Sequence, residues 1–306
     1  MQSTLESSVS VTPPTRGFRA LVLATRPKTL IAAVAPICVG TALATHRTEL
    51  SAIWSGLALL SALCIQIGTN FFNDAIDFKK GADTAERIGP RRATQSGWLT
   101  SRQVHWAGVT FFFLALLLAL PLVHRGGWPI VAIGVASLIC GYAYTGGPMP
   151  LAYFGLGDLF VLIFFGEVAV GGVYYLQTQT WNAAAAVAGL QVGSLATVLI
   201  AINNLRDRAT DIKVRKRTLA VIGGERFSRI EISALALGPY LAGFYWLQEG
   251  MAPALWLPIL TLPLALRLVQ SIWVTPPSAM YNQFLGKAAG LSLLFSLLLA
   301  AGFALS

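Results

Sequence analysis

The sequence predicts an all-α, polytopic membrane protein of nine transmembrane helices around a central cavity. Of its 306 residues, 55% are hydrophobic and only 11% are charged. The mean hydropathy is +0.66. Several stretches of about 20 residues carry no charge, which is long enough to cross the ~30 Å hydrocarbon core of a bilayer as helices.

Polar, proline-containing or glycine-containing breaks separate the apolar runs in order. The breaks are HRTELS (46–51), the polar stretch from 79 to 102, HRGG (124–127), TGGPMP (145–150), TQTWN (178–182), the basic stretch from 206 to 227, EG (249–250) and TPPSAMYNQ (275–283). The predicted spans are 18–45, 52–78, 103–123, 128–145, 157–177, 182–205, 228–248, 252–273 and 284–305.

Residues 1–17 differ from the rest of the chain in being polar. They carry Glu6 and a Pro-Pro pair, and they lack the basic segment followed by a short apolar segment that marks a cleaved signal peptide. We therefore expect a disordered tail at 1–17 and a single transmembrane domain at 18–306.

Lysine and arginine are distributed unevenly between the two ends of the predicted spans. With the N-terminus inside, 20 of the 22 basic residues fall on the cytoplasmic side, and only Arg47 and Arg125 fall outside. Because cytoplasmic loops are enriched in these residues, the asymmetry predicts a cytoplasmic N-terminus. A basic face on anionic lipid explains the net charge of +9 without a nucleic-acid partner, since no aromatic stacking platform accompanies the basic residues.

Two matching polar clusters end the second and the sixth span. In each, residues that share one helix face point their oxygens into a common space. The clusters are Asn70, Asp74 and Asp77, spaced i, i+4, i+7, and Asn203, Asp207 and Asp211, spaced i, i+4, i+8. A single Asp at a helix end is usually a solvated surface group, but two matching clusters at equivalent ends favour a functional site.

If the aspartates in and next to these clusters converge on one site, their negative charges need neutralisation, since like charges in a low-dielectric environment would otherwise protonate or move apart. The five are Asp74, Asp77, Asp83, Asp207 and Asp211. Carboxylate and amide oxygens suit Mg²⁺, which one or two carboxylates and substrate phosphates usually hold. The sequence therefore predicts a magnesium site. Its candidate ligands are Asn70, Asn73, Asp74, Asp77, Asp83, Asn203, Asp207 and Asp211.

Basic runs follow both clusters, as GPRRATQSG (89–97) and RDRATDIKVRKR (206–217), and RPKT (26–29) precedes the first. Guanidinium groups match phosphate oxygens, and lysine adds a point charge. The combination of metal ligands with cations indicates a diphosphate site. A nucleotide-driven pump is disfavoured, because the sequence has no phosphate-binding loop of the GxxxxGK[ST] type.

Four ordered blocks resemble the UbiA superfamily of membrane prenyltransferases, and within it the branch that prenylates 1,4-dihydroxy-2-naphthoate in menaquinone and phylloquinone synthesis. The blocks are RPKTLIAAVAPICVGTALA (26–44), NDAIDFKKGADTAERIGPRRATQSG (73–97), YTGGPMPLAYFGLGDLFVLIFFG (144–166) and NNLRDRATDIKVRKRTLAVIGG (203–224). Asp74 and Asp77 are three apart, unlike the NxxxDxxxD spacing elsewhere in the superfamily, which leaves the relative roles of Asp77 and Asp83 open.

The resemblance implies Mg²⁺-dependent transfer of a polyprenyl chain from polyprenyl diphosphate to the naphthoate, with loss of its carboxylate as CO₂ and release of diphosphate. It also implies a bacterial inner-membrane protein whose active site faces the cytoplasm. The residue roles that it implies are catalysis for Asp74, Asp77, Asp207, Asp211 and Tyr144, diphosphate binding for Arg91, Arg92, Lys213 and Arg217, and acceptor binding for Arg26 and Lys28.

Two other functions stay open from the sequence alone. One is a related prenyltransferase with another aromatic acceptor, such as homogentisate, 4-hydroxybenzoate or haem, which the blocks at 83–97 and 144–166 disfavour. The other is a secondary transporter, although transporter sites usually lie near the membrane midplane rather than at one face. Glu167, inside the fifth span, is equally compatible with a substrate contact and with a buried polar link between helices, and the role of Asp158 is also open.

Overall fold

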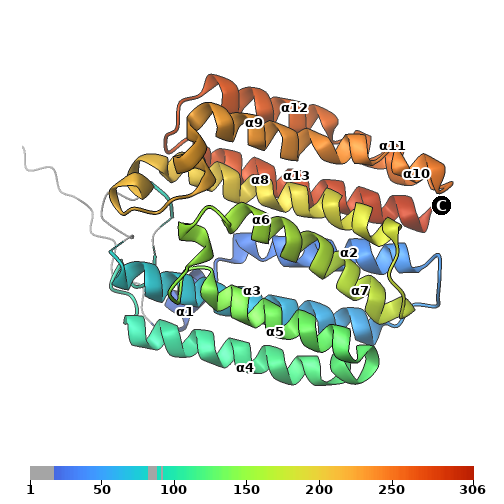
Figure 1. The fold of residues 1–306 in the computed structure, drawn as a ribbon, viewed down its shortest axis with the longest axis horizontal. Helices are drawn as coiled ribbons and strands as arrows, with labels where there is room; N and C mark the ends of the chain where they lie inside the picture. The colour runs from blue at the N-terminus through green and yellow to red at the C-terminus, as the bar shows by residue number, and fades with distance from the viewer. Residues whose placement is uncertain (1–16, 82–87, 91) are drawn as a thin grey trace, which may run out of the picture.

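The computed structural model describes residues 17–81, 88–90 and 92–306, apart from the side chain of Lys28. The described residues form helices and turns and contain no strand, which confirms the all-α prediction. Most helices run along the long axis of one elongated bundle (Figure 1). Nearly all of the polar 1–17 tail, together with the candidate residues Asp83 and Arg91, lies outside the described residues.

The helices follow the predicted spans closely. They are α1 (Phe18–Ala24), η1 (Pro27–Thr29), α2 (Ile31–Ala44), α3 (Ala52–Lys79), α4 (Ser101–Gly126), α5 (Trp128–Ala143), η2 (Leu151–Tyr153), α6 (Gly157–Leu162), the π-helical η3 (Ile163–Val168), α7 (Ala169–Thr178), α8 (Ala183–Lys213), α9 (Leu219–Ala242), α10 (Tyr245–Gln248), α11 (Ala252–Ile259), α12 (Leu262–Val274) and α13 (Tyr281–Ala304).

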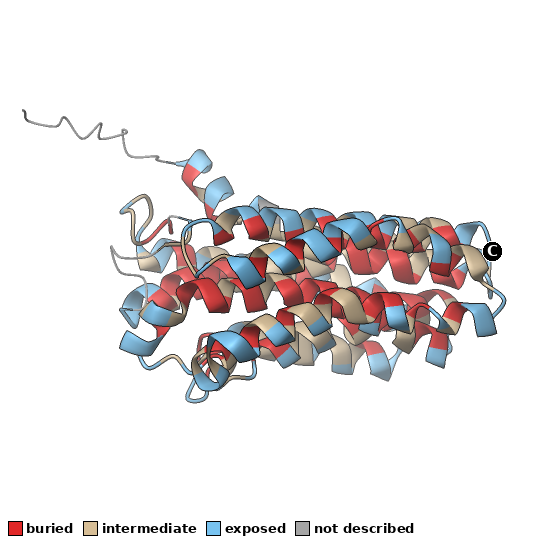
Figure 2. Cartoon of the chain, turned by 90° about the horizontal axis from the view of Figure 1, so that it is seen from above, coloured by how far each residue is buried: buried red, intermediate tan, exposed pale blue. Residues whose placement is uncertain are grey.

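Within the described residues, six helical runs are long and apolar enough to cross a membrane, namely α3, α4, α6–α7, α8, α9–α10 and α13. The bent pair α11–α12, with 46° between its halves, makes a seventh. The shorter apolar helices α2 and α5 correspond to the remaining two predicted spans. The count of nine crossings therefore stays a prediction. Figure 2 shows buried residues along the inner faces and exposed ones outside, where large apolar side chains such as Leu120 and Leu241 lie.

The first predicted span differs from the structure, because the chain breaks between α1 and α2. Arg26 adopts the left-handed conformation, with φ 55° and ψ 65°, and Pro27 begins the short helix η1. A residue that precedes proline is disfavoured in the right-handed helical region, so an unbroken helix from 18 to 45 is not formed. The sixth span also differs, since α8 continues two turns beyond the predicted end at 205 and carries the whole second polar cluster.

Helix α8 lies at the centre of the larger half of the bundle, between α9, α13 and the α6–α7 run (Figure 1). Side chains of α8, α9 and α13 form most of the main apolar core. Gln191 of α8 accepts a hydrogen bond from the indole of Trp246 at 3.0 Å and donates to the carbonyl of Pro239 at 2.8 Å, which joins α8 to α9 and α10.

The carboxyl-terminal ends of α3 and α8 lie at the same end of the bundle, on the left of Figure 1. The connection from α5 to α6, residues 144–156, lies at this end too. The fold therefore brings the ends of both polar clusters to one face of the molecule, together with the loop that carries Tyr144.

Candidate active site

The first cluster centres on Asp77, near the end of α3. One of its carboxylate oxygens accepts a hydrogen bond from the Arg92 guanidinium at 3.2 Å, and the other accepts one from the Tyr153 hydroxyl at 3.0 Å. Asp77 and Arg92 are both buried. A buried charge of this kind requires a partner, and Arg92 provides it.

The second cluster is organised by Arg206, whose side chain is fully buried on α8. Its guanidinium donates to both oxygens of Asp207, at 2.8 and 2.6 Å, and to the amide oxygens of Asn203 at 2.5 Å and Asn282 at 2.7 Å. Two of the predicted metal ligands, Asn203 and Asp207, therefore share this arginine in the structure.

The two clusters are joined through Tyr153 and Lys216. The ammonium of Lys216 lies 5.8 Å from the centroid of the Tyr153 ring and 3.6 Å from an oxygen of Asp211. The Tyr153 hydroxyl contacts Asp77 on the other side. A continuous polar chain thus runs from Asp77 on α3 to Asp211 on α8. Its order is Asp77, Tyr153, Lys216 and Asp211, so that one aromatic ring and one positive charge lie between the two carboxylates.

Tyr144, directly after α5, lies among the charges of this site. Burial raises the pKa of its phenol, and so do the negative charges of Asp158, Asp77 and Asp211, whereas Arg26 acts in the opposite direction. The phenol therefore stays protonated at neutral pH. Carboxylates from α3, α6 and α8 therefore all act electrostatically on Tyr144.

Asn73 of α3 and Lys80, directly after α3, contact the start of the 144–156 connection. Thr145 donates its hydroxyl to the amide oxygen of Asn73 at 2.9 Å, and its carbonyl accepts from the Lys80 ammonium at 2.6 Å. Burial lowers the pKa of Lys80, and the charge of Asp77 partly opposes this shift. The Lys80 ammonium also lies 4.6 Å from the Tyr153 ring centroid.

Asn70 and Asp74 contact the backbone of neighbouring segments. Asn70 donates to the Thr25 carbonyl at 2.9 Å and to the Thr29 hydroxyl at 3.2 Å. Asp74 accepts from the backbone N–H groups of Ala93 at 2.9 Å and Thr94 at 3.3 Å, and from the Thr94 hydroxyl.

The donor set fits a hard divalent cation, although the ligands are not gathered as one ready-made site. In the described part of the chain, no three Asp, Glu, His or Cys side chains are grouped closely enough to hold a metal. The second carboxylate oxygen of Asp211 is nevertheless buried without a hydrogen-bond partner. A buried, unpartnered carboxylate oxygen suits Mg²⁺, which binds oxygen ligands.

The structure separates the predicted cations into two groups. Arg92 forms an ion pair with Asp77, and the charge of Arg26 acts on Tyr144. In contrast, Lys213 at the end of α8 and Arg217 shortly after it are exposed. The backbone N–H of Arg217 donates to the Tyr153 carbonyl at 3.1 Å. The predictions for Asp83 and Arg91, and for the side chain of Lys28, fall outside what the structure describes.

Tyr153 was not identified from the sequence as a residue of the site. Arg206 and Lys216 were expected as cations of the basic run at 206–217, but their pairing with Asp207 and Asp211 was not predicted. Nothing in the spacing of Tyr153 and Lys216 indicates that they meet. Of the two residues whose roles were open, Asp158 is buried and accepts from the Asn204 amide at 3.1 Å. Glu167 lies in the π-helical η3, with one carboxylate oxygen next to Gly189 of α8.

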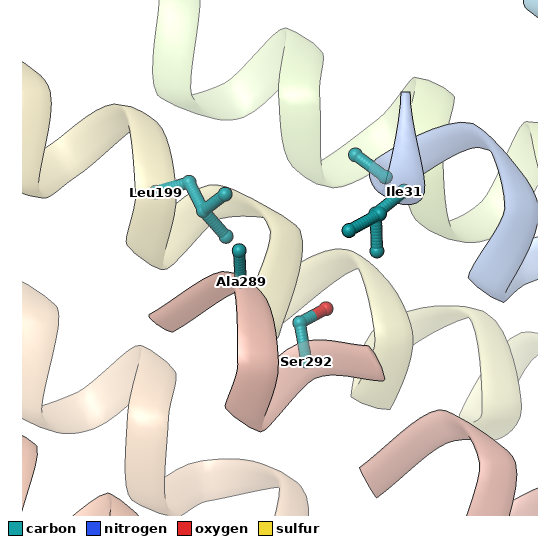
Figure 3. Close-up of a pocket in the computed structure, with 5 residues that line it drawn as sticks. Ile31, Leu199, Ala289 and Ser292 are labelled. Atoms are coloured by element: carbon teal, nitrogen blue, oxygen red, sulfur yellow. The ribbon is translucent and has the colours of Figure 1, made fainter. Parts of the chain in front are cut away.

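A narrow apolar cleft, with no free room for a water-sized molecule, lies between α2, α8 and α13. Its lining residues are Ile31, Ala32, Leu199, Ala289 and Ser292 (Figure 3). Leu199 lies one helical turn before Asn203, so the cleft begins directly beside the second polar cluster. A hydrocarbon tail would fit here only if these helices moved apart.

Comparison with known proteins places the chain in a family. Residues 33–291 match the UbiA prenyltransferase family. The chain is 32% identical to a 1,4-dihydroxy-2-naphthoate octaprenyltransferase of Haemophilus influenzae, over 90% of this chain and 93% of that one. It is 39% identical to the Escherichia coli protein of the same name, over 70% of this chain and 71% of that one.

Solved structures share the fold. A UbiA homolog from Aeropyrum pernix matches with a TM-score of 0.69 at 12% identity, over 90% of this chain and 97% of that one. A UbiA homolog from Archaeoglobus fulgidus bound to GPP and Mg²⁺ matches with a TM-score of 0.66 at 16% identity, over 93% and 99%. The chain belongs to the UbiA prenyltransferase family and is a prenyltransferase.

Proposed function

We propose that this enzyme transfers a polyprenyl chain from polyprenyl diphosphate to 1,4-dihydroxy-2-naphthoate, with loss of the carboxylate as CO₂ and release of diphosphate. The allylic carbon–oxygen bond breaks, and a carbon–carbon bond forms to the electron-rich ring. The polar chain from Asp77 to Asp211 carries the proposal for the diphosphate end. Relatives at 32% and 39% identity that bear the naphthoate enzyme's name support the acceptor.

Asp77, Asp211 and the amide oxygens of Asn73 and Asn203 would hold Mg²⁺, which would neutralise charge on the departing diphosphate. Asp207, which pairs with Arg206, would lie next to this metal site. Arg92 and Lys216 would bind the diphosphate oxygens. Each pairs with a proposed metal ligand, Asp77 or Asp211, and so lies next to the place where the diphosphate would bind. Lys213 and Arg217, which are exposed, would add positive charge on the solvent side of the site.

Tyr144 would donate a hydrogen bond to the leaving group or stabilise the allylic cation with its ring. Burial and three carboxylates keep its phenol protonated, which supports a donor role. Arg26, whose charge acts on this phenol, would bind the acceptor carboxylate. The first isoprene units would pack against the apolar side chains between α2, α8 and α13, with these helices moving apart to admit them.

The membrane setting completes the proposal. We place the site at the cytoplasmic face of a bacterial inner membrane, with nine crossings in one domain at 18–306 and the N-terminus inside. The partners are then polyprenyl diphosphate, the naphthoate and the lipid bilayer. The basic surface at this end would lie against anionic headgroups.

The test uses purified enzyme in lipid vesicles with radiolabelled polyprenyl diphosphate. Transfer to 1,4-dihydroxy-2-naphthoate, dependent on Mg²⁺ and accompanied by CO₂, is expected. Parallel reactions with 4-hydroxybenzoate, homogentisate and haem measure the competing acceptors, and faster transfer to any of them would reassign the acceptor. Full activity in excess chelator would remove the metal from the proposal.

A further inference from the structure

The polar end of α3 carries two stripes, each an Asn and an Asp four residues apart. Residues at this interval share one face of a helix. Asn73 and Asp77 contact the 144–153 connection. Asn70 and Asp74 contact two different segments, at 25–29 and 93–94.

Asn70 holds the segment that presents Arg26. Its amide donates to the carbonyl of Thr25 and to the hydroxyl of Thr29, and this hydroxyl in turn donates to the Arg26 carbonyl at 2.9 Å. Arg26 has φ 55°, a left-handed conformation that is uncommon for a residue other than glycine. Hydrogen bonds on both sides of Arg26 stabilise this otherwise unfavourable turn.

Asp74 holds the segment that presents Arg92. Only 1% of Asp74 is exposed, and both of its carboxylate oxygens accept hydrogen bonds from residues 93 and 94. The Thr94 hydroxyl also donates to the Asp74 backbone carbonyl at 3.2 Å. Arg92, the preceding residue, is thereby brought to Asp77.

Asn70 and Asp74 each match the hydrogen-bonding groups of the segment that they contact. The 25–29 segment offers a carbonyl and a hydroxyl oxygen, which require the N–H donors of an asparagine. The 93–94 segment offers N–H groups, which require the acceptor oxygens of an aspartate. We propose that Asn70 and Asp74 are positioning residues that hold Arg26 and Arg92 in the active site, and that they are not metal ligands.

This inference rests on the proposed function, and its test uses two isosteric exchanges, Asn70→Asp and Asp74→Asn. Each variant keeps an oxygen that can bind a metal. Asn70→Asp replaces the donor toward its segment by an acceptor, and Asp74→Asn replaces one of two acceptors by a donor. We expect Asn70→Asp to raise KM for the aromatic acceptor, and Asp74→Asn to raise KM for polyprenyl diphosphate, each by about tenfold or more. The Mg²⁺ concentration for half-maximal activity should stay unchanged in both.

Direct Mn²⁺ binding, measured by electron paramagnetic resonance, separates positioning from ligation without activity. Asp211→Asn, which alters a proposed ligand away from both segments, should weaken Mn²⁺ binding by about tenfold or more. Asn70→Asp and Asp74→Asn should bind Mn²⁺ within about threefold of the unaltered enzyme, a small free-energy change. Weakening equal to that of Asp211→Asn in either variant would overturn the proposal for that residue.

A second readout uses Thr94→Val, which removes one hydroxyl and leaves every proposed ligand in place. Arg92 is buried, so tryptic cleavage after it requires release of its segment. Asp74→Asn and Thr94→Val should both accelerate this cleavage, whereas Asp211→Asn should not. Unchanged cleavage in Asp74→Asn and Thr94→Val would refute the anchoring role. Because proteolysis needs no substrate, this result stands even if the proposed reaction is wrong.

Discussion

Tyr153 contacts both acidic helix ends through different parts of one side chain. Its hydroxyl donates to Asp77 at 3.0 Å, while its ring lies 4.6 Å from the Lys80 ammonium and 5.8 Å from that of Lys216. A hydrogen bond to a charged group contributes ~1.5–3 kcal/mol, and a cation–π contact ~0.5–2 kcal/mol. The two contributions are separable, because phenylalanine keeps the ring and loses only the hydroxyl.

Tyr153→Phe is expected to lower kcat/KM for prenyl transfer by about tenfold or more, since Asp77 loses one of its two partners. The apparent melting temperature should change little, because the ring keeps its packing. Steady-state kinetics and thermal unfolding in detergent measure the two quantities. Tyr153→Leu, which also removes the ring, should lower kcat/KM further. Unaltered kinetics in Tyr153→Phe would exclude a role for the hydroxyl.

At the residue level, the sequence identified the charged groups better than their partners. Helical spacing indicated Asn70, Asp74 and Asp77 on α3, and Asn203, Asp207 and Asp211 on α8, because it depends only on local geometry. Their roles remain predictions. Arg206 and Tyr153 could not be assigned in this way. The role of Arg206 depends on Asn282, which is 76 positions away, and that of Tyr153 depends on a loop between two helices.

Among the helices, the contact of α8 with the π-helical η3 is unusually close. A Cβ atom on Gly193 would lie 2.4 Å from the carbonyl oxygen of Leu162 and 2.8 Å from the Cα of Gly166. Both are backbone atoms, so the neighbouring helix would have to move as a whole. Small residues allow membrane helices to approach in this way.

Gly193→Ala is therefore expected to destabilise the fold by ~1–3 kcal/mol, the usual effect of overpacking. Gly290→Ala on α13 is the matched control, because a Cβ there meets nothing within 4 Å. Alanine favours a helix over glycine by up to ~1 kcal/mol, so the control should be unchanged or more stable. Apparent melting temperatures in detergent compare the variants, and an equal response of both would contradict the close-contact explanation.

The hydropathy pattern predicted the ends of most helices to within a few residues of their positions in the structure, because lipid exposure and helix length leave a strong compositional signal. It did not reveal the break at Arg26 or the extension of α8 to Lys213. Both features involve polar residues whose partners the hydropathy pattern does not indicate. The break depends on Asn70, and the extension carries Asp207 and Asp211, whose partners include residues outside the apolar part of the helix.

Across the whole molecule, the two ends of the bundle differ in charge. The described N-terminal helix α1 and the C-terminus lie at opposite ends (Figure 1), which requires an odd number of crossings if both ends of the bundle reach the membrane surfaces. The candidate site lies at the α1 end. Arg47 and Arg125, the two basic residues predicted to lie outside, follow α2 and end α4 at the opposite end (Figure 1).

This asymmetry predicts the orientation of the enzyme, since basic loops are retained in the cytoplasm. Single cysteines at two exposed positions, Arg47→Cys and Arg102→Cys, test it in a background that lacks Cys38, Cys64 and Cys140. A membrane-impermeant maleimide should label Arg47→Cys in intact cells, and Arg102→Cys only after permeabilisation. The reverse pattern would place the site outside the cytoplasm. The proposed function requires a cytoplasmic site, since its diphosphate substrate would bind at the basic end of the bundle, which the charge bias predicts to lie inside.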